Sequence, residues 1–318
     1  MKKSGERSIA IIGMSCRFPG AERLRDFWEL LRSGKDAITD IPTSREGMHG
    51  YLATTPATRG RSSSRQGGFI GDIDAFDYSL FGISRRDALS MDPQQRILLE
   101  LAWMALEDAG IPTSSLRGSC TGVFAGVCYN DYNDIQLQNP RDFDVYRMVG
   151  GTRSMLCGRI SHLLGLSGPS LTVDAACASS LVAVHLALAS LRSGESELAL
   201  VAGVNLLLHP LISVGFSQAN MLSPDSRCKA FSDRADGFVR SDGAGLIVLK
   251  PLERALLDGD RIYAVLRGSG VSSDGGSDGP LMTPSVQGQA LALRAAYADA
   301  EIDPAAVSYV EAHGTGTP

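Results

Sequence analysis

The stretch from Ser170 to Ser193 carries a cysteine in a setting that favours chemistry. The short apolar run Leu171 to Val173 predicts a strand, and the apolar segment after it predicts a helix that ends at Gly194. This pattern places Cys177 in the first turn of the helix. Its sulfur would there face unpaired backbone N–H groups and the positive end of the helix dipole, which both favour a thiolate. Because a thiolate can attack an acyl carbon, Cys177 is the candidate nucleophile.

A structural interpretation of Cys177 competes with the catalytic one. Free cysteine is among the most buried residue types and often acts as a small hydrophobe in a core. The strand–turn–helix placement favours catalysis. The residues around the thiol are also small enough to leave room for an acyl group: Ala175, Ala176, Ala178 and Ser179.

His313 is the best candidate partner for this thiol, either as a base or as a neutral hydrogen-bond donor. It lies between a predicted strand, Val307 to Glu311, and a glycine-rich turn that lets other groups approach closely. The other histidines fall in loops, element ends or apolar helices and are interpreted as structural: His49, His162, His185 and His209. A Cys/His pair alone allows a cysteine protease, a thioester hydrolase or a condensing enzyme.

Composition excludes several classes of protein. The 318 residues, 44% of them hydrophobic and 20% charged, suffice for one large or two medium globular domains. A net charge of −5 argues against nucleic acid or an anionic membrane as a partner, since both require a concentrated basic face.

No apolar run reaches transmembrane length, so we expect a cytoplasmic protein. The six cysteines form neither a CxxC pair nor a cluster at zinc spacing, so we expect no metal and no disulfide framework.

Predicted strands and helices alternate along the chain, which indicates the α/β class. The predicted strands are Ser8 to Gly13, Thr121 to Val127, Leu198 to Val204, Leu246 to Leu249 and Ile262 to Leu266. Three helices are predicted. The first spans Leu24 to Arg32, the second is capped by Asp92 and runs to Gly110, and the third spans Gln287 to Ala300. Residues 41–68, rich in Thr, Ser, Arg, Gly and Pro, predict a long exposed loop.

Six segments in this order resemble the β-ketoacyl synthase (ketosynthase) family, in particular the ketosynthase domains of type I polyketide synthases. They are GMSCRFPG (13–20), FDYSLFGISRRDALSMDPQQRILLELAWMALEDAG (76–110), GPSLTVDAACASSL (168–181), MLSPDSRCKAF (221–231), ADGFVRSDGAG (235–245) and EAHGTGTP (311–318). The resemblance covers essentially the whole chain.

The resemblance implies a thiolase-like fold, a layered αβαβα arrangement of two βαβ-rich halves, and a homodimer. Residues 1–254 would form the N-terminal half that carries the nucleophile, and residues 255–318 would begin the C-terminal half. Cys177 would be the nucleophile, and His313 one of two catalytic histidines. No cofactor would be bound, because substrates arrive on the phosphopantetheine of an acyl carrier protein.

The implied reaction is a decarboxylative Claisen condensation in polyketide or related fatty acid chain elongation. An acyl group held on Cys177 would be joined to a malonyl-type extender, and other synthase domains such as an acyltransferase would be partners. The alternative is a ketosynthase-like domain that binds carriers without condensing, or an inactive fragment that needs a complementary chain.

Three departures from the family pattern stand out. Ala175 and Ala178 occupy positions where hydroxyl residues are common, and Ser241-Asp242 stands where the family usually has Gly-Glu, which is expected to disturb local packing. A complete ketosynthase also continues past the Gly-Thr-Gly-Thr motif to a lysine and a second histidine. We therefore expect the chain to lack the C-terminal part of the domain and to be inactive by itself.

Overall fold

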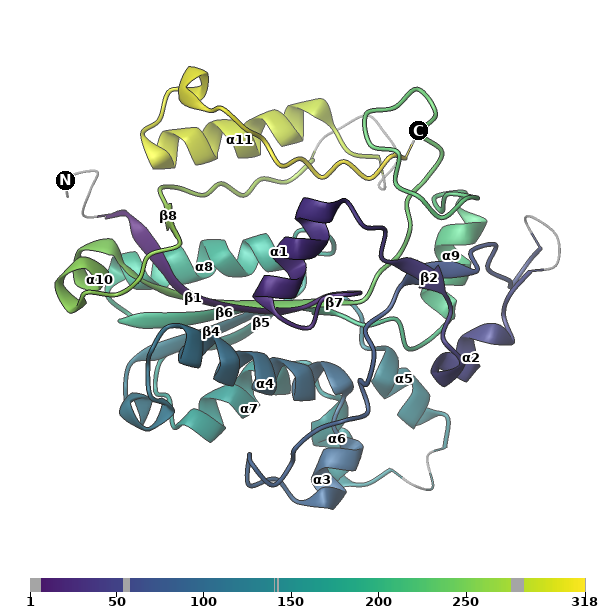
Figure 1. Ribbon diagram of the computed structural model, residues 1–318, viewed down its shortest axis with the longest axis horizontal. Helices are drawn as coiled ribbons and strands as arrows, with labels where there is room; N and C mark the ends of the chain where they lie inside the picture. The colour runs from purple at the N-terminus through teal and green to yellow at the C-terminus, as the bar shows by residue number, and fades with distance from the viewer. Residues whose placement is uncertain (1–6, 54–57, 140, 142, 276–282, 318) are drawn as a thin grey trace.

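A six-stranded sheet forms the centre of the computed structural model, which describes residues 7–53, 58–139, 141, 143–275 and 283–317 (Figure 1). The sheet order is β5-β4-β6-β7-β1-β8. These strands are β1 (Ile9–Arg17), β4 (Thr121–Gly126), β5 (Ser170–Val173), β6 (Leu198–Asn205), β7 (Gly243–Pro251) and β8 (Ala264–Leu266). Strands β5, β4 and β6 are parallel, whereas β7, β1 and β8 each run antiparallel to the preceding neighbour. The carboxyl ends of β4, β5 and β6 therefore meet at one edge of the sheet.

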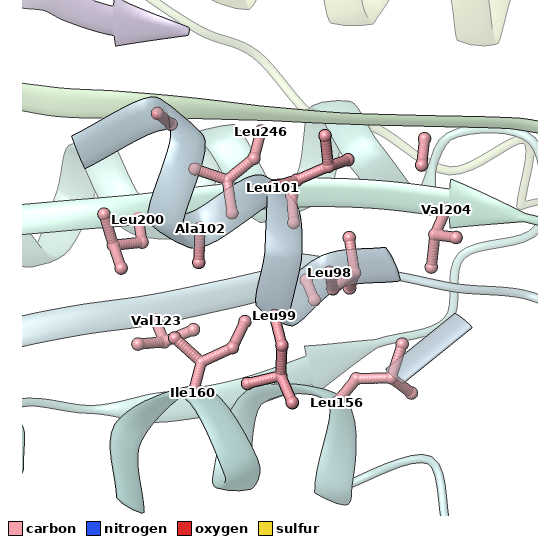
Figure 2. Packing of buried hydrophobic residues seen from close by; sticks show 14 of the residues in the cluster. Leu98, Leu99, Leu101, Ala102, Val123, Leu156, Ile160, Leu200, Val204 and Leu246 are labelled. Carbon is pink, nitrogen blue, oxygen red and sulfur yellow. The ribbon is translucent and has the colours of Figure 1, made fainter. Parts of the chain in front are cut away.

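Helices cover both faces of this sheet. Helices α4 (Pro93–Asp108) and α7 (Met155–Leu164) pack on one face, where Leu98, Leu101 and Leu246 are among the fully buried side chains (Figure 2). Helix α8 (Ser179–Ser193) packs on β4 and β6 across the other face. Each buried leucine contributes roughly 1.5–3 kcal/mol of transfer free energy. The sheet between these layers is consequently a rigid platform for the loops at its edge.

Helix α4 begins as its sequence predicts. The Asp92 carboxylate accepts a hydrogen bond from the Gln94 amide at 2.8 Å, and Pro93 occupies the first helical position. The helix is more deeply buried than a one-sided amphipathic helix, because its polar first turn is buried as well. The Gln95 side-chain amide donates to the Gly150 carbonyl at 2.7 Å, which satisfies one of these buried polar groups.

Helix α8 is apolar along most of its length, although only one side of it is buried in the described chain. Contrary to the expectation from the sequence, the segment Ala176–Ser193 is long and apolar enough to cross a membrane, by length and composition only. Ala183, Ala187 and Leu188 of this helix are buried in one cluster with residues of β4 and β6. Figure 1 also shows α11 (Val286–Ala300) on the far side of α8 from the sheet.

The remaining elements surround this platform. They are α1 (Leu24–Ser33), β2 (Ile38–Asp40), η2 (Thr43–Arg45), α2 (Glu46–His49), β3 (Gln66–Gly68), α3 (Arg85–Ser90), η3 (Thr113–Leu116), α5 (Asp131–Leu137), α6 (Val145–Gly151), α9 (Leu211–Gln218), α10 (Leu252–Asp258) and η5 (Pro304–Ala306).

For two of the segments, the local structure predicted from the sequence is wrong. The described part of residues 41–68 is not one exposed loop, because it contains short helices and strand β3, and Ile41 and Met48 are buried against Leu207. Residues Val307–Glu311 form no strand among the described residues. A strand needs a neighbouring strand to pair its backbone groups, and local composition does not show whether one is at hand.

Candidate active site

Cys177 lies in the turn between β5 and α8, one residue before the helix N-cap, Ala178. The sequence prediction that it sits inside the first helical turn is therefore wrong by two residues, since α8 begins at Ser179. The thiol is exposed. Ala176, directly before it, has φ +50°, a left-handed conformation that costs a residue with a Cβ about 1 kcal/mol or more.

Two side chains hold this strained turn. The Ser179 hydroxyl accepts from the Ala175 amide at 2.9 Å and donates to the Ala176 carbonyl at 2.6 Å. The Asp174 carboxylate accepts from the Ala176 amide at 3.1 Å, and its other oxygen accepts from Arg153 Nη1 at 2.7 Å. Polar groups of the turn thus find partners outside a helical pattern, which explains why the helix starts after the thiol.

The exposed thiol opens into a cavity of about 550 Å³, which we call the thiol cavity. Its walls come from the edge of the sheet where β4 and β6 end and where β7 begins. Its lining comprises Phe18, residues 126–129, 176–177, 179–180, 203–205, Phe216 and residues 238–245. A cavity of this size, lined mostly by apolar and small groups, can hold an acyl chain attached to Cys177.

A second cysteine, Cys128, lines the same cavity, although sequence reasoning did not select it. It lies two residues beyond the end of β4, the strand that pairs with β5. Burial raises the pKa of the Cys128 thiol, and the negative charge of Asp174 raises it further. The pairing of β4 with β5 brings the two cysteines to one cavity, because parallel neighbours bring their carboxyl ends together.

Buried charges contribute to the wall of the cavity. Asp242 accepts from the Leu207 amide at 2.7 Å, from the Ile70 amide at 3.0 Å and from Arg45 Nη2 at 3.1 Å. Burial nevertheless raises the pKa of this carboxyl. Asp242 has a shorter side chain than the glutamate that is usual in the family. Both of its carboxylate oxygens nevertheless accept hydrogen bonds, so the expected disturbance of local packing is not seen at this carboxylate. Arg240, also buried, donates to Ser213 Oγ at 2.8 Å.

His313 is exposed, and no hydrogen bond joins it to Cys177 in the described part of the chain. The turn after it is nevertheless anchored beside the cavity. The Gly237 amide donates to the Gly316 carbonyl at 2.9 Å, and the residues directly after Gly237 line the cavity. The segment that carries His313 therefore rests on the loop that leads into one wall of the cavity.

The interpretation of His185 as structural fits its contacts. Its Nδ1 lies 2.8 Å from the Ser269 hydroxyl, which ties α8 to the segment before α11. Among the described residues, no group of three His, Cys, Asp or Glu side chains could hold a metal ion.

Two family models match nearly the whole chain. The model "Beta-ketoacyl synthase, N-terminal domain" matches residues 6–255, and "Beta-ketoacyl synthase, C-terminal domain" matches residues 263–318. Curated relatives include one polypeptide of the phenolphthiocerol/phthiocerol polyketide synthase of Mycobacterium tuberculosis, 47% identical over 97% of this chain and 20% of that protein. Another polypeptide of the same synthase is 48% identical over 99% of this chain and 17% of that protein. The chain thus spans about a fifth of the length of these relatives.

Solved structures agree with this assignment. A ketosynthase from module 6 of the bacillaene synthase of Bacillus subtilis matches with a TM-score of 0.89 and 39% identity, over 98% of this chain and 52% of that one. An oxazolomycin ketosynthase domain of Streptomyces albus matches with a TM-score of 0.89 and 35% identity, over 98% of this chain and 55% of that one. The chain therefore has a thiolase-like fold and belongs to the β-ketoacyl synthase family, as a ketosynthase domain of the type I polyketide synthase kind.

Proposed function

We propose that this domain catalyses a decarboxylative Claisen condensation in polyketide or related fatty acid chain elongation, with Cys177 as the acylated nucleophile. The observation that carries the proposal is the exposed thiol, held in a braced turn and opening into the thiol cavity. A buried cysteine that served only packing would need neither the strained turn nor the adjoining space.

The first half-reaction is acyl transfer. The Cys177 thiolate attacks the thioester carbonyl of an acyl group on the phosphopantetheine of an acyl carrier protein, and the pantetheine thiolate leaves. The backbone N–H of Cys177 donates to the oxyanion that develops on the attacked carbonyl oxygen. The acyl chain then occupies the thiol cavity.

The second half-reaction forms the carbon–carbon bond. A malonyl-type extender on the carrier loses carbon dioxide, and the electron pair released forms an enolate whose oxygen accepts a hydrogen bond from His313. The enolate carbon attacks the acyl carbonyl, and the Cys177 thiolate leaves. His313 is assigned this role because its segment is anchored to Gly237, directly before residues that line the cavity.

The partners follow from this chemistry and from the relatives. We propose an acyl carrier protein and other synthase domains, including an acyltransferase, as partners within a multidomain synthase. We also propose a homodimer, because β5 forms one edge of the sheet in the described chain and Leu171 on it is 48% exposed. A cytoplasmic location would keep Cys177 reduced, as a nucleophile requires.

We propose that residues 1–254 and 255–318 belong to two halves of the domain. The family models support a division in this region, since the first ends at residue 255 and the second begins at residue 263. Strand β8, from the second part, pairs with β1 of the first, so the two parts fold together.

Mass spectrometry of the intact synthase polypeptide with acyl-loaded carrier tests the proposal. The wild type should gain the acyl mass on the peptide that contains Cys177, and Cys177→Ala should not. His313→Ala should still be acylated but should lose decarboxylation of malonyl carrier. Undiminished loading of Cys177→Ala would overturn the nucleophile assignment, and failure of folded His313→Ala to become acylated would overturn the role of His313.

A further inference from the structure

The loop before the cavity-lining residues 238–240 folds back on itself. The Phe238 amide donates to the Met221 carbonyl and the Ser223 amide donates to the Phe238 carbonyl, both at 2.9 Å. Between these two ends, Lys229 places its ammonium against two carboxylates. Its Nζ lies 2.8 Å from both oxygens of Asp225, and 2.7 and 2.8 Å from those of Asp236. We call Lys229, Asp225 and Asp236 the lysine clasp.

The segment that carries His313 is seated on the backbone of this loop. Gly316 accepts the hydrogen bond from Gly237 and also packs closely against the loop. A Cβ on Gly316 would lie 3.0 Å from the backbone nitrogen of Lys229 and 3.2 Å from the carbonyl oxygen of Gly237. Gly316 also has φ +76°, a conformation that favours glycine. Lys229 and Gly237 therefore form the two sides of the seat for Gly316.

The clasp joins these two sides. Asp236 is the residue directly before Gly237, and Lys229 contributes both its own backbone to the seat and its side chain to Asp236. The pKa of Lys229 is raised by its hydrogen bonds to Asp225 and Asp236. His313 lies only three residues before Gly316, so the seat restrains the segment that carries the imidazole.

We propose that Lys229 is a positioning residue for His313, holding the seat of Gly316 at the width that directs the imidazole to the substrate. This inference rests on the proposed function, because His313 must take part in decarboxylation for its position to matter. The side chains of Asp225 and Asp236 are 60% and 42% exposed, and exposed ion pairs contribute little to global stability. The clasp should therefore affect geometry at the site far more than the free energy of unfolding.

The chain contains a matched control for this proposal. Lys250 also places one ammonium between two carboxylates, at 2.5 Å from Asp258 and 2.6 Å from Asp260. Its side chain is 13% exposed, against 18% for Lys229. This second cluster lies where β7 meets α10 and lines none of the thiol cavity.

The test compares Lys229→Met with Lys250→Met in the intact synthase polypeptide, using malonyl-loaded and acyl-loaded carrier. Lys229→Met should lower decarboxylation by on the order of ten- to a hundredfold while acylation of Cys177 stays within about twofold. Lys250→Met should change neither rate by more than about twofold. Lys229→Arg keeps a positive charge between Asp225 and Asp236, so it should retain most of the decarboxylation that Lys229→Met loses. Equal effects of the two Met variants, or parallel loss of acylation and decarboxylation in Lys229→Met, would overturn the proposal.

Amide hydrogen exchange tests the role of the lysine clasp without relying on activity, for example if the wild type does not decarboxylate malonyl carrier. The Gly237 amide, which bonds Gly316, should exchange faster in Lys229→Met and in the milder Asp236→Asn than in the wild type. It should be unchanged in Lys250→Met. Unchanged exchange in both clasp variants would show that the clasp does not hold the seat, whereas a wild type that never decarboxylates would instead refute the proposed function.

Discussion

Gly126, the last residue of β4, lies directly against Ser179, the first residue of α8. A Cβ placed on Gly126 would stand 2.4 Å from the Ser179 carbonyl carbon and 2.4 Å from the Ser180 nitrogen. Both of these are backbone atoms, so they cannot move aside as a flexible side chain could. The close approach of α8, and of the turn that carries Cys177, to β4 is therefore possible only because Gly126 has no side chain.

Gly126→Ala should displace the start of α8 and misplace the thiol. We expect a loss of about 1–3 kcal/mol in the free energy of unfolding, as for overpacked cores, and a fall in the acylation rate of Cys177. Denaturant unfolding and the rate of acyl loading measure the two effects. Gly215→Ala on α9 is the control, because nothing lies within 4 Å of its Cβ position. Equal acylation rates in the two variants would contradict this account.

Ser179→Ala should loosen the turn from within. It removes the hydroxyl that bonds both the Ala175 amide and the Ala176 carbonyl, each bond contributing about 1 kcal/mol. We expect a loss of about 2 kcal/mol in stability and slower acylation of Cys177. Ser161→Ala removes a solvent-exposed hydroxyl that donates to the Ser170 hydroxyl at 2.9 Å, so it should cost little stability and leave the acylation rate unchanged. An acylation rate in Ser179→Ala equal to that of the wild type would show that the two hydrogen bonds of the Ser179 hydroxyl are not needed to position Cys177.

The pH at which Cys128 becomes reactive should depend on Asp174. Burial and the Asp174 charge both raise the pKa of this thiol. In a Cys177→Ser background, Asp174→Asn removes the charge and leaves the burial, so alkylation of Cys128 by iodoacetamide should begin at lower pH. Peptide mass spectrometry across a pH range of about 7–10 measures the shift. A shift toward higher pH would mean that Asp174 acts on Cys128 by something other than its charge.

Asp92 should make stability fall as pH rises through mildly acidic values. Burial raises its pKa from the ordinary value of 3.8 to about 6, against the hydrogen bonds from Gln94 that lower it. The protonated carboxyl thus stabilises the fold below pH 3.8, and this contribution is lost as pH rises through about 6. The loss amounts to roughly 3 kcal/mol, since one pKa unit corresponds to about 1.4 kcal/mol.

Denaturant unfolding of the wild type and Asp92→Asn at about pH 4 and about pH 7 checks this sign. The wild type should lose about 2 kcal/mol relative to the variant between the two values, because at pH 4 the unfolded carboxyl is already partly ionised. Asp144→Asn, at the N-cap of α6, should behave in the opposite way. The pKa of Asp144 is lowered by the Arg147 amide and then by Arg86, so its contribution is present at neutral pH and is lost as pH falls. Parallel pH dependence in both variants would contradict the assignment.

The sequence alone determined the features that depend on neighbours along the chain. Asp92 caps α4 as expected, and Gly34 and Gly194 end their helices in the left-handed conformation. The strand at Thr121–Gly126 was also predicted to within one residue. Each of these follows from a few consecutive side chains and the backbone groups beside them. The family was likewise readable from six motifs in order.

The tertiary structure decided which distant residues meet. Cys128 lines the cavity of Cys177 because β4 and β5 pair in parallel, a choice that neither strand encodes by itself. Residues Val307–Glu311 have strand-like composition but no strand partner in the described chain, and the Gly316 seat depends on a loop about 80 positions earlier. Local rules predict helices and turns because their hydrogen bonds close within a few residues. Strand pairing, the contacts of buried charged side chains and the seat for Gly316 join residues far apart in sequence, so only the folded chain specifies them.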